Sequence, residues 1–173
     1  MKILLEGRPG AGKSTVARRL ADRLRDEGIR VSGFITEEIR EGGRRRGFSV
    51  EQLGGELGVL AHIEIPGPPR VGRYGVDLAA LERIAMPALQ RPDEHDVTII
   101  DELGKMELAS RAFRDALSAL FERPVAVVAT VQAASHPLTD ELKRRRDIET
   151  LRVTKANRDE LPELLADRLR SPQ

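Results

Sequence analysis

Residues 7–15 read Gly7-Arg8-Pro9-Gly10-Ala11-Gly12-Lys13-Ser14-Thr15. The stretch satisfies the P-loop pattern, in which a glycine, four residues and a second glycine precede lysine and then serine or threonine. Glycines allow successive backbone N–H groups to curl around an anion, and a helix that starts near Lys13 adds unpaired donors and its positive dipole end. The whole stretch is therefore predicted to cradle a chain of phosphates.

Three side chains of this stretch have predicted roles. Lys13 is expected to reach the β and γ phosphates as a point charge, and the Ser14 hydroxyl is placed to ligate Mg²⁺. Thr15 is expected to donate a hydrogen bond to the α phosphate. A glycine-rich turn that only connected a strand to a helix would leave Lys13 unexplained.

The flanking sequence predicts a strand before the loop and a helix after it. Residues 2–6 form a short apolar run, and residues 13–27 carry apolar residues at helical spacing before Gly28. Further strands are expected at 97–100, 125–131 and 148–154, and further helices at 76–89, 108–121 and 157–169, the last opened by a capping box at Asn157. Uniform apolar strands that alternate with helices predict an α/β fold, with a parallel sheet covered on both faces.

One segment breaks this alternation. Residues 31–36 and 47–53 read as strands on either side of a Gly- and Arg-rich turn at 41–46, so we expect a β-hairpin insertion. Another strand is expected at 57–65. The chain has 173 residues, which fits a single domain over residues 1–173.

The composition excludes several classes of function. There are no cysteines, which removes disulfides, Cys-ligated metals and thiol nucleophiles. The net charge is +1, with one Tyr and no Trp, so a dedicated nucleic-acid binder is not indicated. No apolar stretch is long enough to span a bilayer, and the first residues lack the apolar region of a signal peptide, so a cytoplasmic protein is expected.

A pair of acidic residues follows the apolar strand 97–100. Asp101 is predicted to end a core strand at the sheet edge where ligands bind, and to hold Mg²⁺ opposite Ser14 as a Walker-B-type carboxylate. Glu102 is the candidate general base that aligns an attacking water, and this pairing favours hydrolysis over transfer. Glu107 is the rival base, and an Asp-Glu pair that only caps the next helix is the alternative without a catalytic role.

The stretch Ile100-Asp101-Glu102-Leu103-Gly104-Lys105-Met106-Glu107-Leu108 resembles the signature of the THEP1 family of nucleoside-triphosphatases. Residues 33–40, 43–48, 71–74 and 129–131 resemble the same family, and so does Thr154 with residues 157–159. The resemblance implies a RecA-like P-loop core and slow, Mg²⁺-dependent hydrolysis of ATP, GTP and other nucleoside triphosphates. It also implies, by family position, that Asn157 and Arg158 contact the base.

Several roles stay open at this stage. A catalytic arginine could come from Arg44, Arg45 and Arg46, from Arg144, Arg145 and Arg146, or from Arg158. Glu37 and Glu38 are either carboxylates near the metal or exposed hairpin charges. No residue pattern reads adenine or guanine, so relaxed choice among ATP, GTP, CTP and UTP is expected.

The preferred function is hydrolysis of the β–γ bond to give a nucleoside diphosphate and phosphate, with Lys13 and Glu102 as the catalytic residues. One alternative is a small-molecule or nucleoside kinase with the arginine-rich hairpin as a lid. The other is a nucleotide-gated binding module, in which slow hydrolysis acts as a timer.

Overall fold

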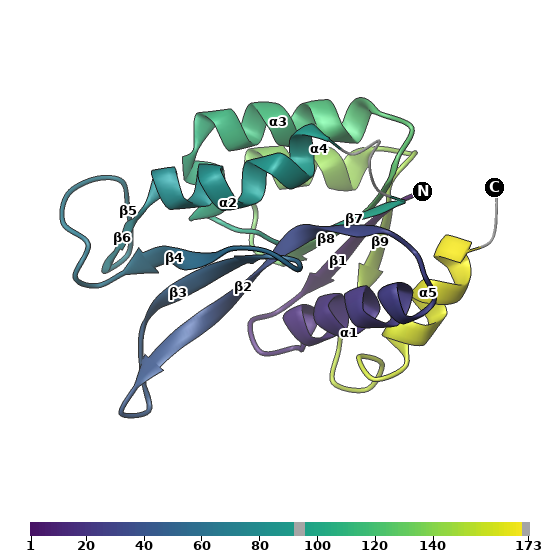
Figure 1. Cartoon of the computed structure of the whole chain (residues 1–173), viewed down its shortest axis with the longest axis horizontal. Helices are drawn as coiled ribbons and strands as arrows, with labels where there is room; N and C mark the ends of the chain where they lie inside the picture. Colours follow the sequence, from purple (N-terminus) through teal and green to yellow (C-terminus); the bar gives the residue numbers. More distant parts are fainter. Residues whose placement is uncertain (92–95, 171–173) are drawn as a thin grey trace.

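The computed structural model describes residues 1–91 and 96–170. In these ranges the strands form one sheet, in the order β5-β6-β4-β3-β2-β7-β8-β1-β9 (Figure 1). The strands are β1 (Lys2–Gly7), β2 (Val31–Glu41), β3 (Arg44–Gln52), β4 (Leu57–His62), β5 (Arg70–Val71), β6 (Tyr74–Val76), β7 (Val97–Leu103), β8 (Ala126–Gln132) and β9 (Glu149–Arg152).

The sheet has a parallel core and an antiparallel extension. Strands β2, β7, β8, β1 and β9 pair in parallel, as the alternating sequence pattern predicts. Strands β3, β4, β6 and β5 continue from β2 by antiparallel pairing. The predicted hairpin insertion is thus the start of this extension, and β5 and β6 are short strands that the sequence analysis missed.

The hairpin turn is shorter than the sequence suggested. Only Gly42 and Gly43 form it, with φ angles of 53° and 77°, which suits the tight two-residue turns of β-hairpins. The arginines assigned to the turn belong instead to β3, where Arg45 pairs with Arg40 and Arg44 with Glu41 across the ladder. Their charges are accommodated because the strand ends are exposed and lined with glutamates.

The helices are α1 (Lys13–Asp26), α2 (Leu78–Gln90), α3 (Arg111–Glu122), α4 (Pro137–Arg144) and α5 (Leu161–Arg170), with a short 3-10 helix η2 (Glu107–Ala109). Asp77 caps the start of α2, because its side chain accepts from the Ala80 N–H at 2.9 Å. Ser110 caps α3 in the same way. Helix α4 was not predicted, and the helix expected at 108–121 is split into η2 and α3.

The predicted capping box at Asn157 is wrong. Helix α5 begins only at Leu161, and the Asn157 side chain bonds backward along the chain. Its Oδ1 accepts from the Thr154 N–H at 2.8 Å, and its Nδ2 donates to the Arg152 carbonyl at 2.8 Å. Asparagine here closes the loop after β9, an alternative to capping that its short amide side chain readily provides.

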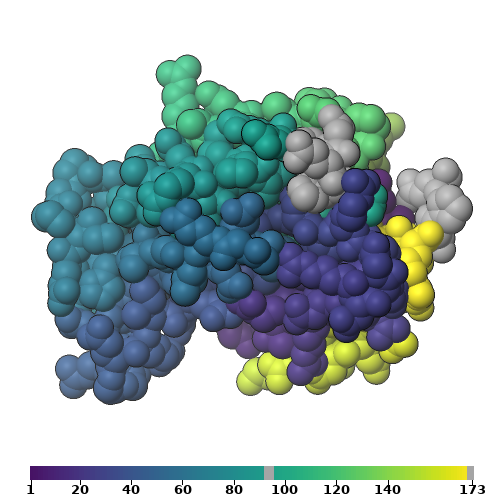
Figure 2. Space-filling view, viewed as in Figure 1, coloured from purple at the N-terminus to yellow at the C-terminus, as the bar shows by residue number. Residues whose placement is uncertain are grey.

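Two apolar cores lie on opposite faces of the sheet. Alternate residues of a strand point to opposite faces, so Ile3 and Leu5 pack in the core beneath α1 and α5, whereas Leu4 packs in the core beneath α2 and α3. Figure 1 shows these helix layers on either side of the strands. In the space-filling view, the β2–β6 part of the chain extends to one side of the α1 and α5 layer (Figure 2). Within residues 1–91 and 96–170, no helix has the length and apolar character needed to cross a membrane.

Candidate functional site

The glycine-rich loop connects the end of β1 at Gly7 to the start of α1 at Lys13. Gly10 and Gly12 have φ angles of 77° and 105°, in the left-handed region that side chains disfavour. A Cβ atom on Gly12 would also lie 2.7 Å from Cδ of Arg158. The loop therefore requires glycine at position 12 both for its backbone angle and for the close packing of Arg158.

Lys13 is buried at the start of α1, with 7% of its surface exposed. Its Nζ donates to the Gly7 carbonyl at 3.1 Å and lies 3.4 Å from Oε2 of Glu102. These contacts aim the ammonium group at the space above the loop. The predicted lysine and the predicted base therefore meet in one site, although 89 positions separate them in the sequence.

Asp101 lies in β7 and is fully buried. The Thr130 hydroxyl donates to its Oδ1 at 2.5 Å, while Oδ2 has no hydrogen-bond partner among the described residues. Burial raises the pKa of Asp101 to about 6, although Thr130, Ser14 and Lys13 all favour the charged form.

These two residues fit a Mg²⁺ site. An unpartnered buried carboxylate oxygen needs a positive or donating neighbour, and Asp101 and Ser14 offer the hard oxygen ligands that Mg²⁺ prefers. No group of three or more acidic, His or Cys side chains with metal-binding geometry occurs in the described parts of the chain. Mg²⁺ keeps several waters and takes phosphate oxygens as ligands, so Asp101 and Ser14 would be its protein ligands here.

Glu102 is held between two side chains. The Gln132 amide donates to its Oε1 at 2.7 Å, and Lys13 lies near its Oε2. The peptide bond between Asp101 and Glu102 is cis. Asp101 is buried and accepts from Thr130 of β8, whereas Glu102 is 22% exposed and lines the cavity.

Glu107, the rival base, lies in η2 and is almost fully buried. Its Oε2 accepts from the Gly104 N–H at 3.1 Å. Burial raises the pKa of Glu107 to about 8, and the nearby charges of Glu102 and Asp101 raise it further against the backbone hydrogen bonds. A carboxyl group that keeps its proton at neutral pH is a poor general base, so the raised pKa of Glu107 favours Glu102 for that role.

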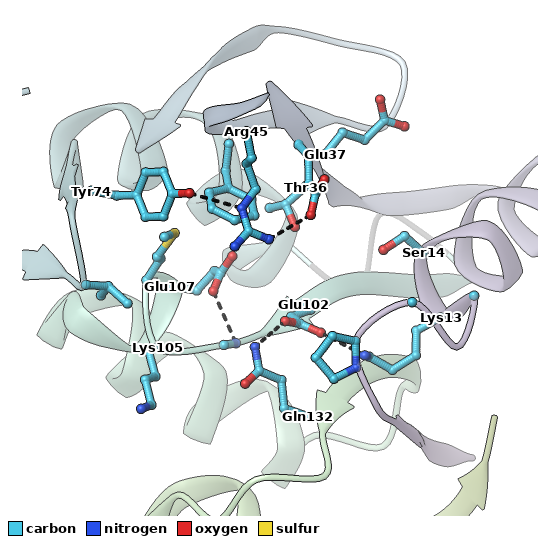
Figure 3. A pocket seen from close by; sticks show the side chains of 18 of the residues that line it. Lys13, Ser14, Thr36, Glu37, Arg45, Tyr74, Glu102, Lys105, Glu107 and Gln132 are labelled. Carbon is cyan, nitrogen blue, oxygen red and sulfur yellow. Dashed lines mark hydrogen bonds and ion pairs between the residues drawn. The ribbon is translucent and has the colours of Figure 1, made fainter. Parts of the chain in front are cut away.

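These side chains border one cavity of about 760 Å³ (Figure 3). Of the predicted site residues, it is lined by Pro9, Gly10, Gly12, Lys13, Ser14, Thr15, Glu102 and Arg158. The predicted residues that do not line it are Gly7, Arg8, Ala11, Asp101 and Asn157. Gly7 and Asp101 still contact residues of the site, because the Gly7 carbonyl accepts from Lys13 and the Asp101 side chain accepts from Thr130. Arg8 is exposed. The amide of Asn157 is used within its own loop.

The structure separates the candidate arginines. Arg45 and Arg158 line the cavity, whereas Arg44, Arg46 and the cluster at 144–146 do not. Arg45 donates to the Tyr74 hydroxyl at 3.0 Å and to Glu38 at 2.8 Å.

The two hairpin glutamates, Glu37 and Glu38, also line the cavity, but each is paired with arginine. Glu37 accepts from Arg18 at 2.8 Å, and Glu38 accepts from Arg40 and Arg45. These pairings favour the hairpin-charge interpretation of Glu37 and Glu38 over that of metal ligands.

Sequence reasoning missed the roles of Thr130 and Gln132. Both lie on β8, between β1 and β7, and they hold Asp101 and Glu102 respectively. The signal was present, because each is a polar residue near the carboxyl end of an apolar strand, where ligands of parallel sheets bind.

A family model described as NTPase matches residues 2–166, nearly the whole chain. This chain belongs to that family of nucleoside-triphosphatases, which includes THEP1. A Thermotoga maritima relative, nucleoside-triphosphatase THEP1, is 43% identical over 93% of this chain and 91% of its own length. The human cancer-related nucleoside-triphosphatase is 37% identical over 92% of this chain and 91% of its own.

The fold of the THEP1 family is found across the whole chain. The crystal structure of THEP1 from Aquifex aeolicus superimposes with a TM-score of 0.89 at 35% identity, and covers 99% of this chain and 100% of that one. The solution structure of the human cancer-related enzyme gives a TM-score of 0.84 at 36% identity. The predicted α/β P-loop fold is thus confirmed, and so is the family that the sequence signature suggested.

Proposed function

We propose that this protein hydrolyses nucleoside triphosphates, including ATP and GTP, to nucleoside diphosphate and phosphate in a Mg²⁺-dependent reaction. The observation that carries the proposal is the position of Glu102. Its carboxylate lies in the cavity beside Lys13, at the end of a phosphate-binding loop, and is fixed by Gln132. A base in this position is next to the terminal phosphate of a nucleotide bound by the loop.

The chain's own groups account for phosphate binding. Backbone N–H groups of the loop and of the first turn of α1 surround the β phosphate, and Lys13 bridges the β and γ phosphates. Ser14 and Asp101 would hold Mg²⁺, with Oδ2 of Asp101 as the free ligand oxygen. When bound, Mg²⁺ would neutralise the negative charge that develops on the transferred phosphoryl group.

Glu102 orients the attacking water and accepts its proton. The Gln132 hydrogen bond occupies Oε1, which leaves Oε2 to face Lys13 and the space above the loop. Oxygen of water attacks the γ phosphorus, the bond to the β–γ bridging oxygen breaks, and that oxygen leaves with the diphosphate. Lys13 stabilises the negative charge on the γ phosphate during the attack and on the bridging oxygen as it leaves.

The cavity offers little with which to choose among bases. Arg158 packs against Gly12 beside the loop, and its guanidinium stacks on any base without reading its edge. Asn157 shapes this loop rather than contacting the base, because its amide is already bonded to Thr154 and Arg152. We therefore expect ATP, GTP, CTP and UTP to be hydrolysed at similar rates.

The decisive test is the pair of variants Glu102→Gln and Glu107→Gln. Glu102→Gln should lower the rate of phosphate release by about 10²–10⁴ while a fluorescent ATP analogue still binds, since only the base is lost. Glu107→Gln should keep most of the activity. Wild-type turnover in Glu102→Gln would disprove the base assignment.

The metal requirement and the base preference need a separate measurement. Phosphate release from the four nucleoside triphosphates should be compared in Mg²⁺ and in EDTA. We expect activity with all four in Mg²⁺ and none in EDTA. Activity that persists in EDTA would contradict the proposed role of Asp101 and Ser14.

A further inference from the structure

Lys143 connects the carboxyl ends of two strands that carry the site. It lies in α4, outside the cavity, and its Nζ donates to Oε1 of Glu6 at 2.6 Å and to the carbonyl of Gln132 at 3.1 Å. Glu6 precedes Gly7, the last residue of β1, and Gln132 is the last residue of β8. One ammonium group therefore holds both strand ends at the point where the phosphate-binding loop begins.

Helix α4 fixes the position of this lysine. Leu142, the residue before it, is buried in the core beneath α2 and α3, and Thr139, one turn earlier, is also buried. The Lys143 side chain is 16% exposed, and that of Glu6 is 30% exposed. A lysine that is largely covered and donates to two acceptors has lost most of its rotational freedom, so its ammonium group is a fixed contact and not a mobile surface charge.

The position of Gln132 sets the position of Glu102. Nε2 of Gln132 donates to Oε1 of Glu102 at 2.7 Å, which is one of the dashed lines in Figure 3. Backbone pairing supports this region less, because the register of β7 on β8 shifts between Ile100 and Leu103, on either side of Glu102. Gln132 thus bonds to Lys143 through its main chain and to Glu102 through its side chain.

We propose that Lys143 is a positioning residue for the hydrolysis reaction. By holding the main chain of Gln132, it sets where the Gln132 amide lies, and through that amide it sets where the Glu102 carboxylate lies. This inference rests on the proposed role of Glu102 as the base. Lys143 does not line the cavity, so it acts on the rate of the chemical step and not on nucleotide binding.

Lys143→Met removes the ammonium group and keeps a long, unbranched side chain. The kcat for phosphate release from ATP should fall by about fivefold or more, while KM and the affinity for a fluorescent ATP analogue stay within about twofold of wild type. Lys143→Arg keeps the charge and the donors and should recover most of the lost kcat. Lys2→Met is the matched control and should keep wild-type kcat, because Lys2 is similarly buried and pairs with Asp147 at 3.3 Å at the other end of β1.

A double-mutant cycle separates the route through Gln132 from a general effect on the sheet. If Lys143 acts by placing the Gln132 amide, its loss has no further effect once that amide is gone. The kcat of Gln132→Ala/Lys143→Met should therefore lie within about twofold of that of Gln132→Ala alone. Losses that multiply would overturn the inference, because the free-energy effects of independent sites add.

The single variants also distinguish this inference from the proposed function. A Lys143→Met protein that keeps wild-type kcat, or that loses nucleotide affinity instead, would overturn it. If circular dichroism shows that Lys143→Met has not folded, Glu6→Gln/Lys143→Met leaves no unpaired charge and should show the same fall in kcat. If Glu102→Gln keeps wild-type turnover, the proposed base is wrong and this inference fails with it; if Glu102→Gln loses activity and Lys143→Met does not, only this inference fails.

Discussion

Replacement of Glu107 by glutamine should change how stability depends on pH. Burial raises the pKa of this carboxyl group from 4.5 to about 8 in the folded protein. A raised pKa means that folding favours the protonated form. The stabilisation is complete below about pH 4.5, declines as the unfolded chain ionises, and is lost once the pH has risen through about 8. Glutamine cannot ionise, so the variant lacks this decline.

The size of the effect follows from the same pKa. Each unit of pH between the two pKa values costs about 1.4 kcal/mol of unfolding free energy, and the slope flattens near the folded-state value. From about pH 6 to about pH 8, wild type should therefore lose about 2 kcal/mol more than Glu107→Gln. Asp101 adds little in this window, because its own pKa is about 6. The amide oxygen of glutamine can still accept from the Gly104 N–H.

Urea denaturation in EDTA measures this difference directly. The chain has no Trp, so unfolding is followed by far-ultraviolet circular dichroism at both pH values. Glu141→Gln is the matched control, since Glu141 is exposed on α4 and should behave as wild type. Equal pH dependence in wild type and Glu107→Gln would refute the claim that Glu107 is protonated at neutral pH, and would restore it as a candidate base.

Two further variants test the phosphate end of the site. Gln132→Ala removes a hydrogen bond to a charged group, so kcat should fall by about tenfold or more, with KM nearly unchanged, because Glu102 is no longer held. A change confined to KM in steady-state kinetics would contradict this. Gly12→Ala should weaken nucleotide binding by about tenfold or more in a fluorescence titration, since its Cβ would meet Arg158 at 2.7 Å. Gly28→Ala is the control, because Gly28 also has a positive φ, of 79°, and a Cβ there would have no atom within 4 Å; this variant should bind nucleotide normally.

Most of the parallel core could be predicted from sequence because β1, β7 and β8 contain apolar runs that are buried on both faces. The run at 97–100 and the segment at 125–131 agree with β7 and β8 to within a few residues. The antiparallel extension was harder, since β5 and β6 contain two and three residues and carry no periodicity. Strand β6 exists by pairing with β4, and β5 exists by pairing with β6, and neither pairing is visible as a sequence pattern.

The motif residues of the site were also predictable, whereas their partners were not. Lys13 and Glu102 were assigned from local patterns, and the structure brings them together. The loop-closing role of Asn157, in place of the predicted capping box, could not be foreseen, because capping and loop-closing asparagines look alike in sequence. The raised pKa of Glu107 likewise depends on its burial by residues far along the chain, and no residue spacing in the sequence predicts this burial.

The order of the strands, rather than any single motif, sets the geometry of the reaction. Strand β8 lies between β1 and β7, and its register places Gln132 beside Gly7. The side chain at the end of β8 is therefore within reach of whatever β7 presents, which here is Glu102. One Glu102 oxygen accepts from Gln132 and the other lies near Lys13, so in the proposed mode of nucleotide binding the carboxylate is directed toward the end of the triphosphate.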